Sequence, residues 1–278
     1  MTDFPVANGP DLWAARFPWP SDDGHKHDRG RLVVVSGGAS HTGAARLAAR
    51  AGLRVGAGLV TMLSPPGAVL VNAAHLEAVM LRAFANPAAL AEACETASAV
   101  IIGPAAGVGE GTCANLRALL AGQAPLVLDA DALTSFADDP AALFAHLRPL
   151  DVLTPHEGEF ERLFPGLLAE GRKAAARKAA ARSGAVVLLK GPRTLIATPQ
   201  GATVENRNAS PFLATAGSGD VLAGIIGGLI AQGMASFDAA CAAAWLHGEA
   251  ARSFGPGLIA EDLPGLLPPV LKGLWEAR

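Results

Sequence analysis

A glycine-rich turn followed by a carboxylate is the part of this sequence best suited to chemistry. Residues 215–220 read Thr-Ala-Gly-Ser-Gly-Asp, and a long apolar stretch begins at Val221. Successive backbone N–H groups in such a turn, at the positive end of a helix dipole, attract phosphate or another developing anion. Asp220 beside this anion hole could act as a general base on a substrate hydroxyl, as a metal ligand, or only as a helix cap.

Four further segments carry polar residues or glycines where apolar strands are expected to end. Ligands of open α/β sheets collect at the carboxyl ends of strands. The segments are Ser36–Ala44, Gly103–Gly107, Asp129–Ala132 and Thr154–Phe160. The first lacks the GxGxxG spacing of a dinucleotide-binding fold, and no GK[ST] follows it. Asp129 and Asp131 stand at alternate positions, so we expect both carboxylates on one face of a strand.

Two groups of charged residues follow the later strands. His156 and Glu159 lie three residues apart at an expected helix start, so both could face one ligand. A capping box of Thr154 and Glu157 is the alternative, and it would leave His156 and Glu159 free. Residues 190–194 place cationic side chains in a turn between two strands, which suits either a bound phosphate or a plain hairpin.

The elements that position these residues alternate regularly along the chain. Short β-branched apolar runs predict strands at 32–36, 59–63, 99–103, 126–129, 151–154, 185–190 and 194–198. Three- and four-residue apolar spacing predicts helices near 44–55, 90–97, 116–120, 172–182, 221–232 and 238–253. The pattern predicts an α/β fold with a mainly parallel central sheet covered by helices on both faces. We expect a single domain over residues 1–278.

Composition narrows the partners and the compartment. The 278 residues include 22 Lys+Arg against 25 Asp+Glu, so we expect no nucleic-acid partner. The three dispersed cysteines fit neither a disulfide framework nor a Cys-rich zinc site. The apolar stretch 221–237 is short of the roughly 20 residues of a membrane span, and the N-terminus does not resemble a signal peptide. We therefore expect a cytoplasmic protein whose apolar N-terminal arm, 1–24, wraps its own domain or a neighbouring subunit.

Five strings together resemble the ADP- or ATP-dependent NAD(P)H-hydrate dehydratases, a carbohydrate kinase-related family of the ribokinase-like fold. They are His25–Arg31, Gly43–Ala44 with Gly56–Thr61, Asp129–Leu133, Leu153–Phe160 and Leu213–Gly224. The resemblance implies a three-layer α/β sandwich and a hydro-lyase that repairs NADH and NADPH hydrated at the nicotinamide ring. It also implies Mg²⁺, a homotetramer, and a separate NAD(P)H-hydrate epimerase, because the chain leaves no room for the epimerase domain that many relatives carry. We expect ADP rather than ATP as co-substrate, because the alanine-rich, arginine-rich composition looks bacterial.

The resemblance also implies a role for each matching residue. Asp220 is the implied base that takes the proton of the substrate hydroxyl. Ala44, Gly107 and His156 join Asp220 in contacting the hydrated dinucleotide, and Glu159 organises Mg²⁺ through water. The implied contacts to the nucleotide and its transferred phosphoryl group are Lys190, Gly191, Pro192, Arg193, Thr194, Thr215, Gly217, Ser218 and Gly219. In the loop 103–107, alanines stand where the family favours Gly-Leu.

Two other functions are compatible with parts of this pattern. A ribokinase-like kinase of a small alcohol or vitamin precursor would share the Gly-Ser-Gly-Asp turn, but the strings 129–133 and 154–156 favour the dehydratase. A non-catalytic nucleotide-binding regulator would need only the anion hole, so the presence of Asp220 favours an enzyme.

Overall fold

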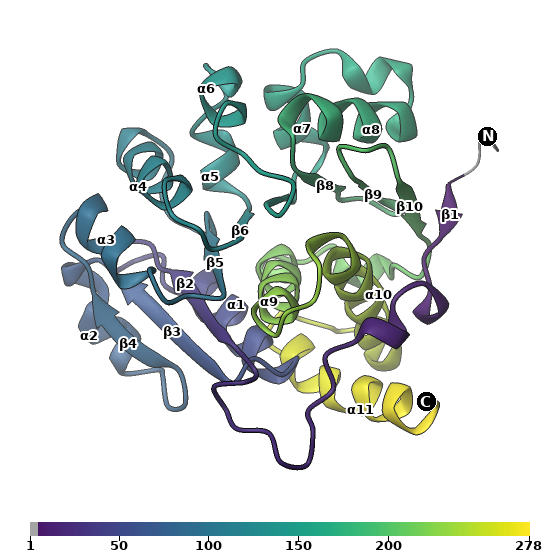
Figure 1. Cartoon of the computed structure of the whole chain (residues 1–278), viewed down its shortest axis with the longest axis horizontal. Helices are drawn as coiled ribbons and strands as arrows, with labels where there is room; N and C mark the ends of the chain where they lie inside the picture. Colours follow the sequence, from purple (N-terminus) through teal and green to yellow (C-terminus); the bar gives the residue numbers. More distant parts are fainter. Residues whose placement is uncertain (1–4) are drawn as a thin grey trace.

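A ten-stranded sheet forms the centre of the computed structural model, which describes residues 5–278 (Figure 1). Its strands are β1 (Val6–Ala7), β2 (Arg31–Val35), β3 (Leu59–Ser64), β4 (Met80–Ala83), β5 (Ala99–Ile102), β6 (Leu126–Leu128), β7 (Val152–Leu153), β8 (Val186–Leu189), β9 (Thr194–Ala197) and β10 (Thr203–Asn206). They lie in the order β1-β10-β9-β8-β7-β6-β5-β2-β3-β4. All seven predicted strands are present, and β1, β4 and β10 are additional.

The sheet is parallel from β4 to β8. The register pairs Leu32 with Val60 and with Ala99, and the same direction continues through β6, β7 and β8. The turn after β8 reverses the chain, so that β8, β9 and β10 are antiparallel neighbours. The mainly parallel sheet is thus confirmed, and so is the hairpin at residues 190–194.

Helices cover both faces of the sheet and give a three-layer α/β structure. One face carries α1 (Gly43–Arg54), α9 (Ser218–Ala231), α10 (Ser236–Phe254) and α11 (Leu263–Glu276). The other carries α3 (Pro87–Ala93), α4 (Glu110–Leu120), α5 (Asp131–Thr134), α6 (Pro140–Phe144), α7 (Glu157–Leu163) and α8 (Arg172–Ser183). The short helices α2 (Val69–Ala73), η1 (Pro10–Leu12), η2 (Ala14–Arg16), η3 (Pro66–Ala68), η4 (Leu167–Glu170) and η5 (Pro211–Leu213) complete the fold.

Strand β2 shows why both faces must be covered. Leu32 and Val34 belong to the core under α1 and α9, whereas Val33 and Val35 belong to the core under α4. Successive side chains of a strand point to opposite faces, so a continuous apolar run needs a helix layer on each side. The β-branched runs of the sequence therefore determine the layering directly.

The glycines of α9 serve close helix packing. A Cβ added to Gly224 would lie 2.3 Å from the carbonyl oxygen of Ala48 in α1, and one added to Gly228 would lie 2.9 Å from Gly52 Cα. The backbones of α1 and α9 touch at these positions, which no side chain at 224 or 228 would allow. Across residues 5–278, none of the helices has the length and apolarity that crossing a bilayer requires.

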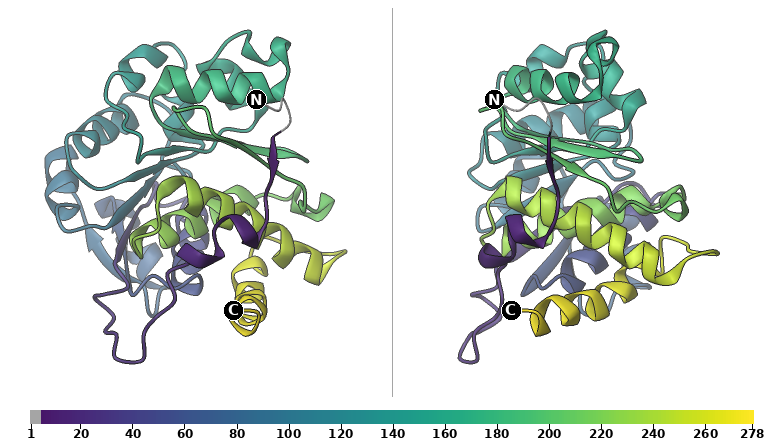
Figure 2. Two further views of the ribbon diagram at one scale, coloured as in Figure 1. Left: turned by 45° about the vertical axis from the view of Figure 1, so that its right-hand side comes forward. Right: turned by 90° about the vertical axis from the view of Figure 1, so that its right-hand side faces the viewer.

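The N-terminal arm lies along its own chain (Figure 2). Its strand β1 pairs with β10, and the amide of Asn8 donates hydrogen bonds to Asn206 Oδ1 and to the carbonyl oxygen of Cys241. Trp13 is fully buried and packs edge-on against Trp245 of α10. The arm therefore forms part of the helical layer around α10. Residues 1–4 of the predicted arm lie outside the described residues.

Candidate functional site

Two glycine loops meet where the strand order of the sheet reverses. The chain runs from β2 through β3 to β4 and then returns to β5 on the other side of β2. Ligands of open α/β sheets bind beyond the carboxyl ends of the strands at such a point. A Cβ added to Gly37 after β2 would lie 1.8 Å from the carbonyl oxygen of Ala105 after β5. The two loops can close on each other only because residue 37 is glycine.

The loop after β5 is tied to the segment after β6. Gly103 has φ +125°, and a Cβ there would lie 1.7 Å from the carbonyl oxygen of Asp129. Further along, Ala105 and Gly107 also have positive φ, and the Gly107 N–H donates to Asp131 Oδ2 at 2.9 Å. Gly107, predicted to contact the substrate, thus lies beside the segment that carries the two aspartates.

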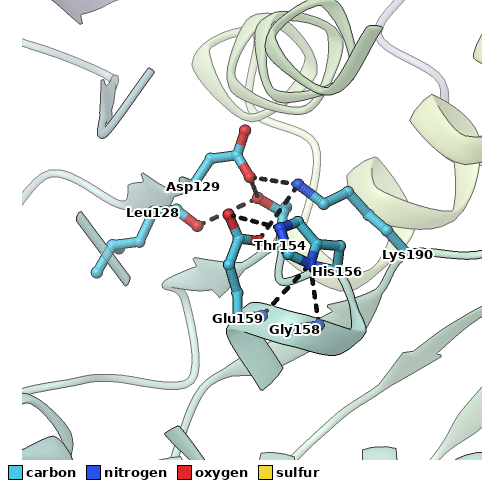
Figure 3. Close-up of polar contacts among 7 residues, drawn as sticks. All are labelled: Leu128, Asp129, Thr154, His156, Gly158, Glu159 and Lys190. Atoms are coloured by element: carbon cyan, nitrogen blue, oxygen red, sulfur yellow. Dashed lines mark hydrogen bonds and ion pairs between the residues drawn. The ribbon is translucent and has the colours of Figure 1, made fainter. Parts of the chain in front are cut away.

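A partly buried lysine lies among carboxylates from neighbouring strand ends (Figure 3). Lys190 Nζ at the end of β8 lies 2.7 Å from Asp129 Oδ1 after β6 and 3.7 Å from Glu159 Oε2 on α7. Thr154 after β7 donates to Asp129 Oδ1 at 2.8 Å. We call these four residues, Asp129, Thr154, Glu159 and Lys190, the Lys190 cluster. Parallel strands bring them to one edge of the sheet although 61 residues separate Asp129 from Lys190.

Charge compensation holds the Lys190 cluster together. Burial alone would lower the pKa of the Lys190 ammonium, but the surrounding carboxylates outweigh burial and raise that pKa. These carboxylates belong to Asp129, Glu159 and Asp220. The lysine therefore stays positively charged and provides a fixed cation at the carboxyl edge of the sheet.

The helix start at α7 differs from the prediction. His156 and Glu159, not Thr154 and Glu157, form the capping box. His156 Nδ1 accepts the N–H groups of Gly158 and Glu159, and Glu159 Oε2 accepts the His156 N–H at 2.9 Å. The alternative capping box of Thr154 and Glu157 is therefore wrong, and the box that forms engages both His156 and Glu159. Glu159 is buried, whereas the His156 side chain is 57% exposed, with its Nε2 3.4 Å from Glu159 Oε1.

Asp220 occupies the first turn of α9, close to the Lys190 cluster. A Cβ added to its neighbour Gly219 would lie 3.4 Å from Lys190 Nζ and 3.7 Å from Asp129 Oδ2. Burial, reinforced by the charge of Asp129, raises the pKa of the Asp220 carboxyl to about 7, although Lys190 opposes the shift. A carboxyl that titrates near neutrality is well matched to general base catalysis.

Asp131 also acts on Asp220, but it does not share a strand face with Asp129 as we expected. Strand β6 ends at Leu128, and Ala130 has φ +47°, so strand alternation does not apply to Asp129 and Asp131. Asp131 instead begins helix α5. Its negative charge still contributes to the raised pKa of Asp220, together with that of Asp129. The prediction of a shared strand face is wrong, but both carboxylates lie near Asp220.

The turn 215–219 before Asp220, which we call the anion turn, has the backbone of an anion-binding loop. Gly217 has φ +88°, and a Cβ there would lie 2.7 Å from Leu47 Cδ1, so the position requires glycine. Ser218 Oγ lies 3.3 Å from Nε2 of His247 on α10. Burial lowers the pKa of His247 to about 4, so this histidine is neutral near pH 7. His247 was not predicted, because only the packing of α10 against α9 brings it behind the turn.

A second unpredicted residue, Arg172, braces the turn 190–194. Its guanidinium donates to the carbonyl oxygens of Lys190 and Arg193 and pairs with Glu157. A Cβ added to Gly191 would lie 2.5 Å from the same guanidinium. Arg193 itself pairs with β10, where its Nη1 lies 3.6 Å from a carboxylate oxygen of Glu205. The sequence indicated only a solvated helix at 172–182, so Arg172 departs from that expectation.

The other predicted residues lie around the same edge of the sheet. Ala44 is the second residue of α1, at the exit of the loop that follows β2. Thr215 opens the anion turn, and its carbonyl oxygen accepts the Ser218 N–H at 3.4 Å. Thr194 begins β9 and donates to the carbonyl oxygen of Gly191. The predicted contacts of these residues with substrate and nucleotide remain predictions.

The carboxylates of the site do not form a complete metal cage. No group of three or more His, Cys, Asp or Glu side chains suited to a metal ion occurs within residues 5–278. Mg²⁺ commonly keeps several waters and binds through one or two carboxylates together with substrate phosphates. The described residues therefore fit a magnesium ion that arrives with a nucleotide, with Glu159 as the predicted partner through water.

These features define a class of protein. A mainly parallel sheet, an anion-binding turn at a helix N-terminus, a carboxyl with a pKa near 7 and a buried lysine are the parts of an α/β enzyme suited to phosphoryl transfer. Such an enzyme stabilises a moving phosphoryl group mainly by fixed donors and charges.

Comparisons with known proteins give the family. Residues 32–263 match the sequence model of the NAD(P)H-hydrate dehydratases. A bifunctional NAD(P)H-hydrate repair enzyme of Moorella thermoacetica is 40% identical, over 94% of this chain and 53% of that protein. An ADP-dependent (S)-NAD(P)H-hydrate dehydratase of Neisseria meningitidis is 38% identical, over 94% and 91%. The crystal structure of the Bacillus subtilis ADP/ATP-dependent NAD(P)H-hydrate dehydratase, co-crystallised with ATP/Mg²⁺, has a TM-score of 0.85 at 27% identity, over 99% and 100%.

The chain belongs to the NAD(P)H-hydrate dehydratase family, which is a family of hydro-lyases. The predicted family and the predicted ribokinase-like fold are both confirmed. The chain spans about half the length of the bifunctional relatives that it matches.

Proposed function

We propose that this chain is an ADP-dependent (S)-NAD(P)H-hydrate dehydratase that restores hydrated NADH and NADPH. The observation that carries the proposal is Asp220: a carboxyl with a pKa of about 7, one residue after the glycine turn 217–219. In this family a base at that position, next to backbone donors for phosphate, explains how a hydroxyl becomes a leaving group.

The proposed reaction has two steps. Asp220 takes the proton of the ring hydroxyl, and the hydroxyl oxygen forms a bond to the β-phosphorus of ADP while AMP leaves. The phosphate then departs with the electrons of the carbon–oxygen bond, a neighbouring carbon loses a proton, and the ring double bond re-forms. The sum is hydrated NAD(P)H plus ADP giving NAD(P)H, AMP and phosphate.

The other residues position the reactants. The N–H groups of Gly217, Ser218 and Gly219 hold the transferring phosphoryl group, and the charge of Lys190 stabilises it from the sheet side. The turn 190–194, braced by Arg172, contacts the nucleotide. Mg²⁺, when bound, neutralises phosphate charge, and Glu159 orients one of its waters.

Ala44, Gly107 and the exposed edge of the His156 ring complete the proposal by contacting the hydrated dinucleotide. We further propose that the protein acts as a cytoplasmic homotetramer together with a separate NAD(P)H-hydrate epimerase. Gel filtration with light scattering tests the tetramer, and adding an epimerase to a mixed-isomer substrate tests the partnership.

Recovery of absorbance at 340 nm tests the activity. The protein is incubated with hydrated NADPH, ADP and Mg²⁺, and phosphate release is measured in parallel. We expect one phosphate for each NADPH formed, and none without ADP. A kinase of a small alcohol or a nucleotide-binding regulator would leave the absorbance flat, so a flat trace with folded protein would refute the proposal.

A further inference from the structure

A charged groove runs along helix α1, outside the Lys190 cluster and the anion turn. Its volume is about 750 Å³, and it lies between α1, the segment 75–79 before β4, and the start of α11. Arg46, Arg50 and Arg54 line it from α1, together with Leu47 and Leu53. The proposed reaction assigns no role to these three arginines.

The spacing of these arginines places them in one row. They are four residues apart, so they follow one face of the helix at intervals of about 6 Å along its axis. Within residues 5–278, none of the three guanidinium groups forms an ion pair, and Nη1 of Arg46 is buried without any hydrogen-bond partner. Glu77 and Glu261 also line the groove, and within residues 5–278 neither forms an ion pair with these arginines. An unpartnered buried guanidinium atom is costly unless a ligand supplies an acceptor.

The groove begins next to the candidate active site. The Arg46 side chain folds back toward the start of its helix, because its Nη2 would lie 4.0 Å from a Cβ added to Gly43. Gly43 adjoins Ala44, the proposed substrate contact. Leu47 also lines the groove, and its Cδ1 would lie 2.7 Å from a Cβ added to Gly217 in the anion turn. A ligand that reacts at Asp220 therefore lies next to the end of the groove that Arg46 lines.

We infer that the groove binds the ADP-ribose half of the hydrated dinucleotide, and that Arg50 and Arg54 bind the 2′-phosphate that distinguishes the NADPH form from the NADH form. This inference rests on the proposed function. Guanidinium groups are well suited to phosphate, since they stay charged and donate paired hydrogen bonds. Arg46, nearest the site, binds the pyrophosphate that both coenzymes carry, and the leucines of the groove contact the apolar parts of the adenosine.

Steady-state kinetics with the two hydrates separate these roles. In the double variant Arg50→Ala/Arg54→Ala, we expect KM for hydrated NADPH to rise about tenfold and KM for hydrated NADH to change less than about twofold. We expect kcat to stay constant, because the contact is equally strong in the ground state and the transition state. Arg46→Ala should raise both KM values together. KM for ADP should not change in any of these variants.

A matched control removes two arginines from the other face of the sheet. Arg177 and Arg182 are exposed on α8, and Arg177→Ala/Arg182→Ala should leave every kinetic constant unchanged. If the unmodified protein turns over neither hydrate, the proposed function fails. If it turns over both, and the Arg50→Ala/Arg54→Ala variant shows equal changes for both hydrates, no change, or a higher KM for ADP, the inference about the groove is overturned and the proposed function stands.

Product binding gives a readout that does not depend on turnover. Titration of the protein with NADPH and with NADH, followed by nicotinamide fluorescence, should show about tenfold weaker NADPH binding in the Arg50→Ala/Arg54→Ala variant and unchanged NADH binding. Added salt should weaken NADPH binding to the unmodified protein more than to the variant, because salt screens exposed charges. Identical salt dependence in both proteins would contradict a phosphate contact at Arg50 and Arg54.

Discussion

Replacement of Asp220 by asparagine is expected to stabilise the folded protein while abolishing its turnover. Burial and the charge of Asp129 raise the pKa of the Asp220 carboxyl from 3.8 to about 7. Between these values the folded protein keeps a proton on Asp220 that the unfolded chain releases. The free energy of unfolding therefore falls as the pH rises through this window, since the folded state binds more protons. Asparagine has nearly the same shape and no charge to bury.

The magnitude follows from the difference between the two pKa values. A difference of about three pKa units, at about 1.4 kcal/mol for each unit, gives an upper limit of about 4 kcal/mol above pH 7. Asp220 is only partly buried, so screening by water reduces this to about 2 kcal/mol. Because part of the cost is already present at pH 5, we expect the stability advantage of Asp220→Asn to grow by about 1–2 kcal/mol between pH 5 and pH 8.

Urea unfolding at pH 5, 6, 7 and 8 measures this advantage directly. Asp138→Asn is a suitable control, because Asp138 is exposed and the variant removes one carboxyl outside the site. The same carboxyl must lose its proton to act as a base, so kcat/KM of the unmodified protein should rise with pH up to about 7 and then level off. A stability difference between Asp220→Asn and the unmodified protein that does not vary with pH would refute the raised pKa and with it the proposed base.

Three other substitutions test the architecture of the site. Lys190→Met leaves the buried carboxylate of Asp129 uncompensated and should cost about 3–5 kcal/mol in urea unfolding, partly restored by adding Asp129→Asn. His156→Ala removes the cap of α7 and should cost about 1 kcal/mol by thermal unfolding, whereas His156→Asn should retain most of the stability. Gly217→Ala forces a side chain onto a φ of +88° and should cost about 1–3 kcal/mol and most of the activity, unlike Gly111→Ala in α4, where a Cβ has open space.

The sequence predicted those elements that have a strong local pattern. Seven buried strands were evident as continuous apolar runs, because strands covered on both faces contain few polar residues. Strands β4 and β10 were missed for the opposite reason. The first reads Met-Leu-Arg-Ala at an exposed edge of the sheet, and the second reads Thr-Val-Glu-Asn next to a hairpin. Helix α11 was missed because Pro268 and Pro269 interrupt its pattern.

The site was predictable where one short segment carries its chemistry. The glycine turn and Asp220 follow each other in the chain, so local reasoning found them. The ion pair between Asp129 and Lys190, the brace from Arg172 and the contact of His247 with the anion turn each join residues far apart in the sequence. These contacts depend on strand order, which no local pattern specifies. The capping box at His156 was misplaced because helix starts are uncertain by one or two residues when read from sequence.

Burial and the charge of Asp129 raise the pKa of the Asp220 carboxyl, and the placement of hydrogen-bond donors around Asp220 does not offset that shift. Asp129 accepts hydrogen bonds from the Lys190 ammonium and the Thr154 hydroxyl, and Glu159 accepts one from the backbone N–H of His156. Within residues 5–278, the Asp220 carboxylate accepts no hydrogen bond, and its nearest compensating charge is a lysine already paired with Asp129. Donors stabilise the ionised form of a carboxyl, and their absence favours the protonated form. The same lack of partners leaves Asp220 available to a substrate hydroxyl, so one arrangement both raises the pKa of the base and keeps the base accessible to its substrate.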